Sequence, residues 1–189
     1  IAAATSQAEG KLEMATITNE NEIETGRKLS TRGQALADRI EEGATGLAAF
    51  AEGLSEAEWR TPVSATDGRT VGVIVHHVAS MYPIEIDVAR TIASGKPVTD
   101  VSWEVVAGIN AQHAEKHAEV TKNATLDLLR RNGREAADAV RTFTNDELDR
   151  AAPFSLSFGA PVTVQFVIED HALRHSWHHL ARIRKALGR

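Results

Sequence analysis

Cysteine is absent from this chain of 189 residues, and aromatic residues make up only 5% of it. The absence of cysteine excludes disulfide bonds, thiolate zinc sites and cysteine nucleophiles, and it leaves the redox compartment open. Any bound metal ion must therefore be held by histidine, aspartate or glutamate side chains.

Long apolar runs and basic clusters are missing as well. No stretch approaches the roughly 20 apolar residues that cross a bilayer, and none has the charged-then-apolar form of an intact signal peptide. With 21 Lys and Arg against 26 Asp and Glu, the formal net charge is −5. No basic cluster alternates with aromatic residues, which disfavours nucleic-acid binding. We expect a soluble, cytoplasmic protein that binds a small-molecule substrate and neither nucleic acid nor a membrane.

The length and the 42% hydrophobic content suit one globular domain with a substantial core. We place this domain at residues 29–189. Residues 1–28 are rich in Ala, Thr, Glu and Asn and show no sustained period. We expect that segment to be a flexible tail, added expression sequence or the remnant of a processed leader, with Met14 as an alternative native start.

The first half of this domain contains two segments with the apolar spacing of amphipathic helices. One covers about residues 30–53 and has Ser30 as its expected cap. The other opens at Thr70 and ends before Gly95. Pro83 lies inside the second segment, where we expect a kink or a break because proline lacks a backbone N–H.

The second half contains the remaining helical segments. Residues 103–131 follow the expected cap Ser102, and residues 134–143 continue in a similar style. Gly133 therefore either ends one helix or interrupts a long one. A last helix begins near Thr163, after a loop marked by prolines and glycine, and no segment shows convincing strand alternation. The expected fold class is all-α, in simple up-down order or with crossover loops.

Histidine is concentrated in two places. Four of the eight histidines lie within residues 171–179, and His76 and His77 are adjacent. Residues four apart share one face of a helix, so His171, His175 and His179 form a stripe. Two such imidazoles joined by a third from another helix give three nitrogen ligands and leave one coordination position open, as in a catalytic metal site.

Periodicity alone does not choose among these histidines. His76 and His77 point about 100° apart on a helix, so one of them should face the bundle axis. His171 with His175 is as good a pair as His175 with His179, and His178 could replace His179. His113 and His117 form another pair, but charged residues lie between them, so we interpret them as a solvated helix face.

The segment Gly68–Ser80, which contains His76 and His77, and the terminal segment His175–Ile183 together resemble the DinB/YfiT-like superfamily of bacterial metalloproteins. The resemblance implies an all-α four-helix bundle with long crossover loops, and a divalent metal ion bound by His77, His175 and His179. Zinc and nickel are the leading candidates, although imidazole ligands do not identify the metal. It also implies a homodimer.

Relatives in this superfamily include thiol-dependent transferases and isomerases, among them mycothiol-dependent maleylpyruvate isomerase, and hydrolase-like members. The resemblance therefore predicts a metal-dependent thiol transferase, isomerase or hydrolase acting on a small molecule, with a low-molecular-weight thiol as a further candidate cofactor. The alternative is a non-catalytic stress or interaction protein with a structural metal. A pocket that opens on the metal favours the enzyme, and a sealed site favours the structural role. No general base or cofactor-binding residue is identified.

Three expectations follow from the predicted metal site, two about the structure and one about the pH dependence of metal binding. The helix that carries His77 must lie beside the last helix. A ligating imidazole usually donates its second N–H to an oxygen acceptor, and the candidate acceptors are Glu85, Asp87, Glu169 and Asp170. Metal binding should weaken as the pH falls through about 6.5, because a protonated imidazole cannot bind metal.

Overall fold

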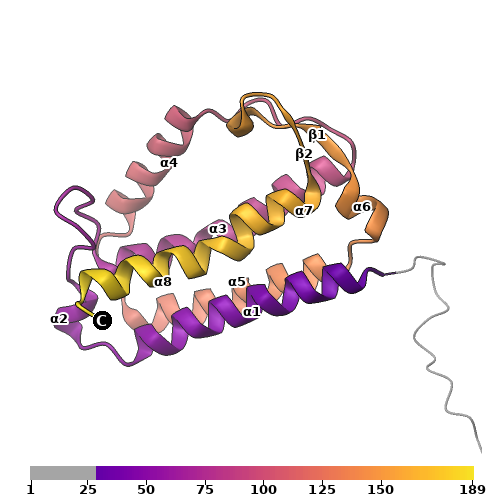
Figure 1. The fold of residues 1–189 in the computed structure, drawn as a ribbon. Coiled ribbons are helices and arrows are strands. Elements are labelled where there is room, and N and C mark those ends of the chain that lie inside the picture. Colours follow the sequence, from indigo (N-terminus) through magenta and orange to yellow (C-terminus); the bar gives the residue numbers. More distant parts are fainter. Residues whose placement is uncertain (1–28) are drawn as a thin grey trace, which may run out of the picture.

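The computed structural model describes residues 29–189, so the predicted tail at residues 1–28 lies outside the described residues. Four long helical stretches form a bundle (Figure 1). These are α1 (Thr31–Glu52), α3 (Val71–Ala93), α5 (Lys122–Arg141) and a terminal helix made of α7 (Val164–Val167), the π-helical segment η3 (Ile168–Leu173) and α8 (Arg174–Ala186). The predicted all-α bundle is confirmed.

Shorter elements connect these helices. They are α2 (Glu56–Trp59), α4 (Trp103–Lys116), α6 (Asn145–Asp149), the 3₁₀ turn η2 (Ser155–Ser157), and strands β1 (Ala151–Pro153) and β2 (Pro161–Thr163). The two strands pair antiparallel and make a small hairpin at one end of the bundle. Each strand is three residues long, and both lie in the segment before the last helix, where the sequence predicted a loop. None of the helices in the described range has the length and apolar character of a membrane span.

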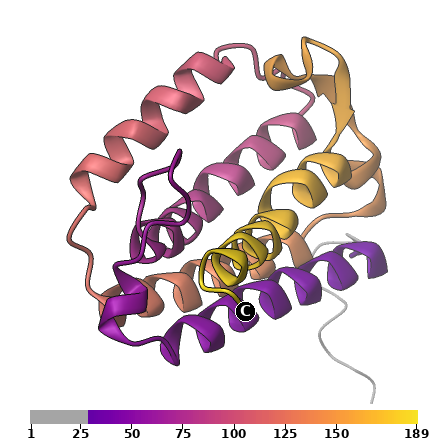
Figure 2. The ribbon, with the colours of Figure 1, turned by 60° about the vertical axis from the view of Figure 1, so that its left-hand side comes forward.

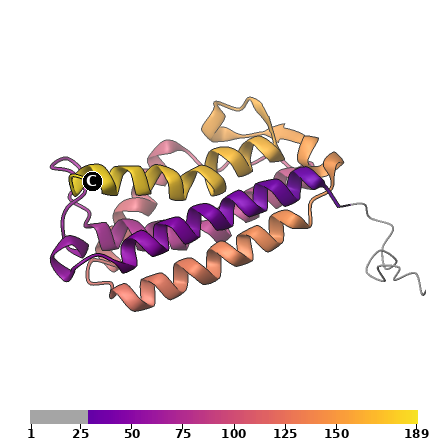
Figure 3. The ribbon, with the colours of Figure 1, turned by 60° about the horizontal axis from the view of Figure 1, so that its bottom comes forward.

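The bundle uses a crossover connection. α1 packs against α5 and the terminal helix, and α3 packs against the same two partners. Figure 3 shows α1 between the terminal helix and α5. α3 and α5 run in the same direction, so the chain must return between them, and α4 makes this return along the outside of α3 (Figures 1 and 2). The expected contact between the helix that carries His77 and the last helix is present.

The predicted helix starts are confirmed by side-chain caps. Ser30, Thr70 and Ser102 each accept a hydrogen bond from the backbone N–H three residues later. Such caps satisfy N–H groups that have no partner within the helix. The polar residues between the apolar segments therefore fix where α1, α3 and α4 begin.

The predicted continuous helix over residues 103–131 is wrong. α4 ends at Lys116 and α5 begins at Lys122, with a turn between them whose Val120 carbonyl accepts a hydrogen bond from Trp59 Nε1 at 3.1 Å. Gly133 does not end α5. A Cβ on Gly133 would lie 2.7 Å from the Cβ of Ala44 in α1, so glycine is needed for the close approach of these two helices.

α3 continues through Pro83 without a break. Proline removes the hydrogen bond to the carbonyl four residues earlier, which here belongs to Ala79. That carbonyl instead accepts a hydrogen bond from the buried Asn132 side chain of α5 at 2.8 Å. A neighbouring helix thus satisfies the group that proline leaves unpaired, and the helix does not end.

This pairing predicts a conditional effect of Asn132→Ala. The variant should lower the free energy of unfolding by about 1 to 3 kcal/mol, because it leaves the buried Ala79 carbonyl unsatisfied. In a Pro83→Ala background, residue 83 regains an N–H that can reach the same carbonyl, so the effect of Asn132→Ala should shrink. Urea unfolding of the four proteins in this cycle measures the coupling. Equal effects of Asn132→Ala in both backgrounds would contradict the explanation.

Candidate metal centre

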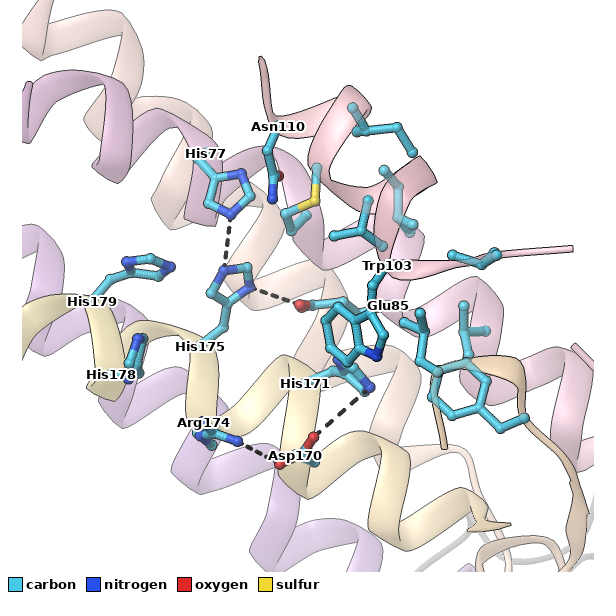
Figure 4. A pocket seen from close by; sticks show the side chains of 18 of the residues that line it. His77, Glu85, Trp103, Asn110, Asp170, His171, Arg174, His175, His178 and His179 are labelled. Atoms are coloured by element: carbon cyan, nitrogen blue, oxygen red, sulfur yellow. Dashed lines mark hydrogen bonds and ion pairs between the residues drawn. The ribbon is translucent and has the colours of Figure 1, made fainter. Parts of the chain in front are cut away.

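Three histidine rings from two helices meet inside the bundle. His77 projects from α3, and His175 and His179 lie four residues apart on α8 (Figure 4). Nε2 of His77 is 3.2 Å from Nε2 of His175, and one ring nitrogen from each of the three lies within 4.8 Å of the other two. Two nitrogens bound to one zinc ion at 2.0 to 2.1 Å are about 3.4 Å apart in tetrahedral geometry. The cluster is therefore close to the spacing that a shared metal ion requires.

A carboxylate sets the orientation of the middle ring. Nδ1 of His175 is 2.7 Å from Oε1 of Glu85, which lies two turns after His77 on α3. A carboxylate accepts hydrogen bonds, so Nδ1 carries the proton and donates it, and Nε2 of the neutral ring keeps its lone pair. Because Nε2 faces His77, the ring offers its lone pair to the centre of the cluster.

The other three candidate acceptors pair elsewhere. Asp87 contacts Arg90, Asp170 contacts Arg174, and Glu169 accepts a hydrogen bond from the side chain of Gln165. Among the four carboxylates considered from the sequence, Glu85 is the one that contacts a ring of the cluster.

The cluster opens on a cavity of about 400 Å³. α4 and the hairpin region supply most of its apolar wall, including Trp103, Val106, Ile109, Phe154 and Leu156. His77, His175 and His179 all line the same cavity, as Figure 4 shows for the residues that it labels. The cluster is therefore accessible to a small molecule and is not sealed by side chains.

The two competing histidines of the terminal helix lie outside the cluster. His171 belongs to the π-helical segment η3, and it is not among the three histidines whose ring nitrogens meet. Its ring instead packs edge-on against Phe154. His178 is exposed beside His179. The pair preferred from the sequence is the pair that meets His77.

A second histidine cluster lies between α3 and α4. His76 contacts His113 and His117, with Nδ1 of His76 2.9 Å from Nε2 of His113. The interpretation of His113 and His117 as a solvated helix face is wrong, because both rings are partly buried against His76. The sequence did contain a signal for this cluster, because His113 and His117 are four residues apart and His76 is next to His77. The path of α4 along α3, which joins them, was not predicted from the sequence.

The comparisons with known proteins identify the family. The sequence matches the DinB superfamily over residues 39–183, which is most of the chain. The chain belongs to the DinB superfamily. Its structure is similar to that of YfiT from Bacillus subtilis, described as "a probable metal-dependent hydrolase with an unusual four-helix bundle topology". The TM-score is 0.68 at 18% sequence identity, over 84% of this chain and 88% of YfiT. The likeness shows a shared fold. No curated protein matches the chain.

Burial favours the neutral form of two rings in the first cluster of this DinB-superfamily protein. Burial and, second, the neighbouring His175 lower the pKa of His77 to about 3 and that of His179 to about 2. In the second cluster, burial and the adjacent imidazoles lower the pKa of His76 and of His113 to about 4. Neutral imidazole is the form that binds metal. For His77 and His179, competition from protons therefore begins well below the pH of about 6.5 expected from the sequence.

The three-histidine cluster predicts which substitutions remove zinc binding. His77→Ala, His175→Ala and His179→Ala should each weaken zinc binding by more than about 100-fold, because loss of a ligand exceeds the 10- to 100-fold effect of an outer partner. His178→Ala is the matched control and should leave the affinity unchanged. Competition with a chromophoric chelator measures the affinity, in proteins that also carry His113→Ala and His117→Ala so that the second cluster does not contribute.

Two outcomes would contradict this assignment. Loss of binding in His178→Ala but not in His179→Ala would mean that the wrong residues of the terminal helix were chosen. Unchanged binding in all three cluster variants would show that the triad is not the metal site.

The low pKa values also predict acid-sensitive stability of the metal-free protein. Below pH 6.5 His77 and His179 become protonated in the unfolded chain but stay neutral in the folded protein. The free energy of unfolding is therefore highest above that pH and falls as the pH drops toward the pKa values of the folded protein. Each ring contributes a slope of about 1.4 kcal/mol per pH unit once the unfolded form is protonated. Urea unfolding between pH 6 and 4.5 should show a slope that His179→Gln reduces by about this amount. An unchanged slope would refute the contribution of His179.

Proposed function

We propose that the protein is a metal-dependent enzyme that acts on a small molecule at the cluster of His77, His175 and His179. The observation that supports this most directly is the cavity of about 400 Å³ onto which all three rings open. Small-molecule sites are concave, mostly apolar and supplied with a few convergent polar groups, and this cavity has that composition. A structural metal would need no such opening.

The donor set suits a divalent transition metal. Three neutral imidazoles and no thiolate favour zinc, nickel, copper or iron over calcium or magnesium. A divalent ion held here would polarise a substrate oxygen or lower the pKa of a water molecule or thiol. Among the described residues, Nδ1 of His77 and Nδ1 of His179 are buried without a hydrogen-bond partner. Such unpaired atoms are uncommon in a protein interior. In His77 the nitrogen that faces the cluster is Nε2, so Nδ1 is the second nitrogen of the ring and an ion in the cluster would not pair it.

The protein side chains have separate tasks in this proposal. Glu85 holds the proton on Nδ1 of His175 and fixes the ring, and is thus a positioning residue. The wall that contains Trp103 and Ile109 binds the apolar part of a substrate and excludes water. Arg69 also lines the cavity, held by two hydrogen bonds to Asp67, and it places a positive charge in the wall that would favour an anionic substrate group.

Hydrolysis is the reaction class that we place first. YfiT, whose fold this chain shares, is described as "a probable metal-dependent hydrolase", and hydrolysis requires no co-substrate besides water. Thiol transfer is the second candidate and comes from the superfamily resemblance. Because the chain contains no cysteine, the thiol would have to be a small molecule that enters the same cavity.

A screen that varies the nucleophile separates these candidates. Chelator-treated protein is reloaded with zinc or nickel and assayed on small esters and amides with apolar groups, with and without a low-molecular-weight thiol. We expect turnover that requires the metal and falls to background in His175→Ala, with Asp87→Ala as the exposed control on α3. Turnover without thiol assigns a hydrolase, and turnover only with thiol assigns a transferase. Bound metal with no turnover in either series would favour the non-catalytic role.

A further inference from the structure

The crossover helix α4 is attached to the bundle in an unusual way. None of its 14 residues is buried, although helices of this length usually depend on tertiary packing for stability. Among the described residues, the contact of His113 with His76 is the one side-chain hydrogen bond that links α4 to α3. Side-chain hydrogen bonding between α4 and α3 in this part of the chain is therefore confined to the second cluster.

These rings are spaced as metal ligands are. Nδ1 of His76 and Nε2 of His113 are 2.9 Å apart, and one ring nitrogen of His117 lies within 4.8 Å of a nitrogen on each of the other two. Nitrogens that share an ion at 2.0 to 2.1 Å are about 2.9 Å apart at a right angle and about 3.4 Å apart at a tetrahedral angle. Small side-chain rotations would bring all three nitrogens onto one ion.

The chemical surroundings of the cluster also suit an ion. It contains three imidazoles and no carboxylate. The rings of His76 and His117 are stacked with their centroids 4.0 Å apart, so one of these rings must turn to direct its nitrogen at a shared ion. The rings are partly exposed, so an ion can enter from solvent. A shared proton satisfies at most one pair of these rings, whereas a metal ion can satisfy all three.

We infer that His76, His113 and His117 form a second site for a divalent transition metal, which fastens α4 to α3. This site is distinct from the cluster of His77, His175 and His179 and does not depend on the function proposed for it. The two sites are neighbours, because His76 and His77 are consecutive and the ring centroids of His77 and His113 are 5.5 Å apart.

Occupancy of the second site has a consequence for the cavity. Trp103, Val106 and Ile109 of α4 form part of its wall, and His113 and His117 lie at the opposite end of that helix from Trp103. An ion that fixes the last turn of α4 holds the helix over the cavity. The second metal would thus order the wall against which a substrate packs.

Zinc stoichiometry of the full chain, prepared without a polyhistidine tag, tests the site. After gel filtration to remove weakly held ions, the wild type should retain two zinc ions per chain. The double variant His113→Ala/His117→Ala should retain one, as should His175→Ala/His179→Ala, and the combination of all four should retain none. The matched control His171→Ala/His178→Ala also removes two histidines and should still retain two ions.

The outcomes separate the two sites. If His113→Ala/His117→Ala retains as many ions as the wild type, the second site is refuted whatever the first site does. If the second ion is lost on gel filtration of the wild type, the cluster binds zinc only adventitiously and the inference also fails. Loss of binding confined to His175→Ala/His179→Ala would support the first site alone.

Hydrogen exchange tests the role of the ion in holding α4. Amides of residues 103–116 should exchange more slowly after the second equivalent of zinc is added, and this protection should be absent in His113→Ala/His117→Ala. Exchange in α5 serves as the internal reference, because that helix packs against both α1 and α3. If the exchange of α4 in the wild type is the same with and without zinc, the ion does not fasten the helix and the inference is overturned.

Discussion

The buried contact between α3 and the terminal helix is the constraint on which the rest of the structure depends. The Tyr82 hydroxyl and the Ser176 hydroxyl are hydrogen-bonded at 2.6 Å, and both side chains are fully buried. Sliding one helix past the other would leave two polar groups unpaired in the core, which is costly. Tyr82 lies between His77 and Glu85 in sequence, and Ser176 follows His175. The bond that fixes the packing of these two helices therefore also brings the histidines and their carboxylate together.

Both helices that build the candidate centre depart from regular α-helical hydrogen bonding next to it. α3 contains Pro83, which leaves the Ala79 carbonyl without its helical hydrogen bond, and Asn132 of α5 donates to that carbonyl instead. The terminal helix contains the π-helical segment that ends at Leu173, directly before α8. π-helical segments are frequent at functional sites because they change which residues face a given direction. Here His171 lies within the segment, and its ring packs against Phe154 outside the group of His77, His175 and His179. The irregularities are thus part of how the site is selected from a surplus of histidines.

Local sequence determines where the helices begin. Long-range contacts determine the turn between α4 and α5, the role of Gly133 and the choice of Glu85, which the sequence did not show. Apolar spacing and capping residues such as Ser30 and Thr70 were sufficient to place α1 and α3, because both effects act within a few residues. The turn at residues 117–121 has no glycine or proline to mark it, and it is held by the remote Trp59. The sequence also could not show whether Gly133 ends a helix. The residue is glycine because Ala44 of the partner helix α1 lies too close for a side chain. Likewise, the family resemblance supported His175 with His179, but the choice of Glu85 among four acids required the packing of α3.

The site is divided between a rigid part and a weakly attached part, and this division bears on specificity. The histidines and Glu85 are carried by helices packed in the bundle, so their geometry is set by the core. The apolar wall of the cavity comes largely from α4 and from the turn that contains Phe154, and α4 buries none of its own residues. Substitutions in α4 can therefore alter the shape of the cavity at little expense to the stability of the bundle. A fold built in this way can keep one arrangement of histidines while the substrate changes. Membership of the superfamily therefore does not fix the reaction. For the same reason, the attachment of α4 through His76, His113 and His117 affects what the cavity can bind.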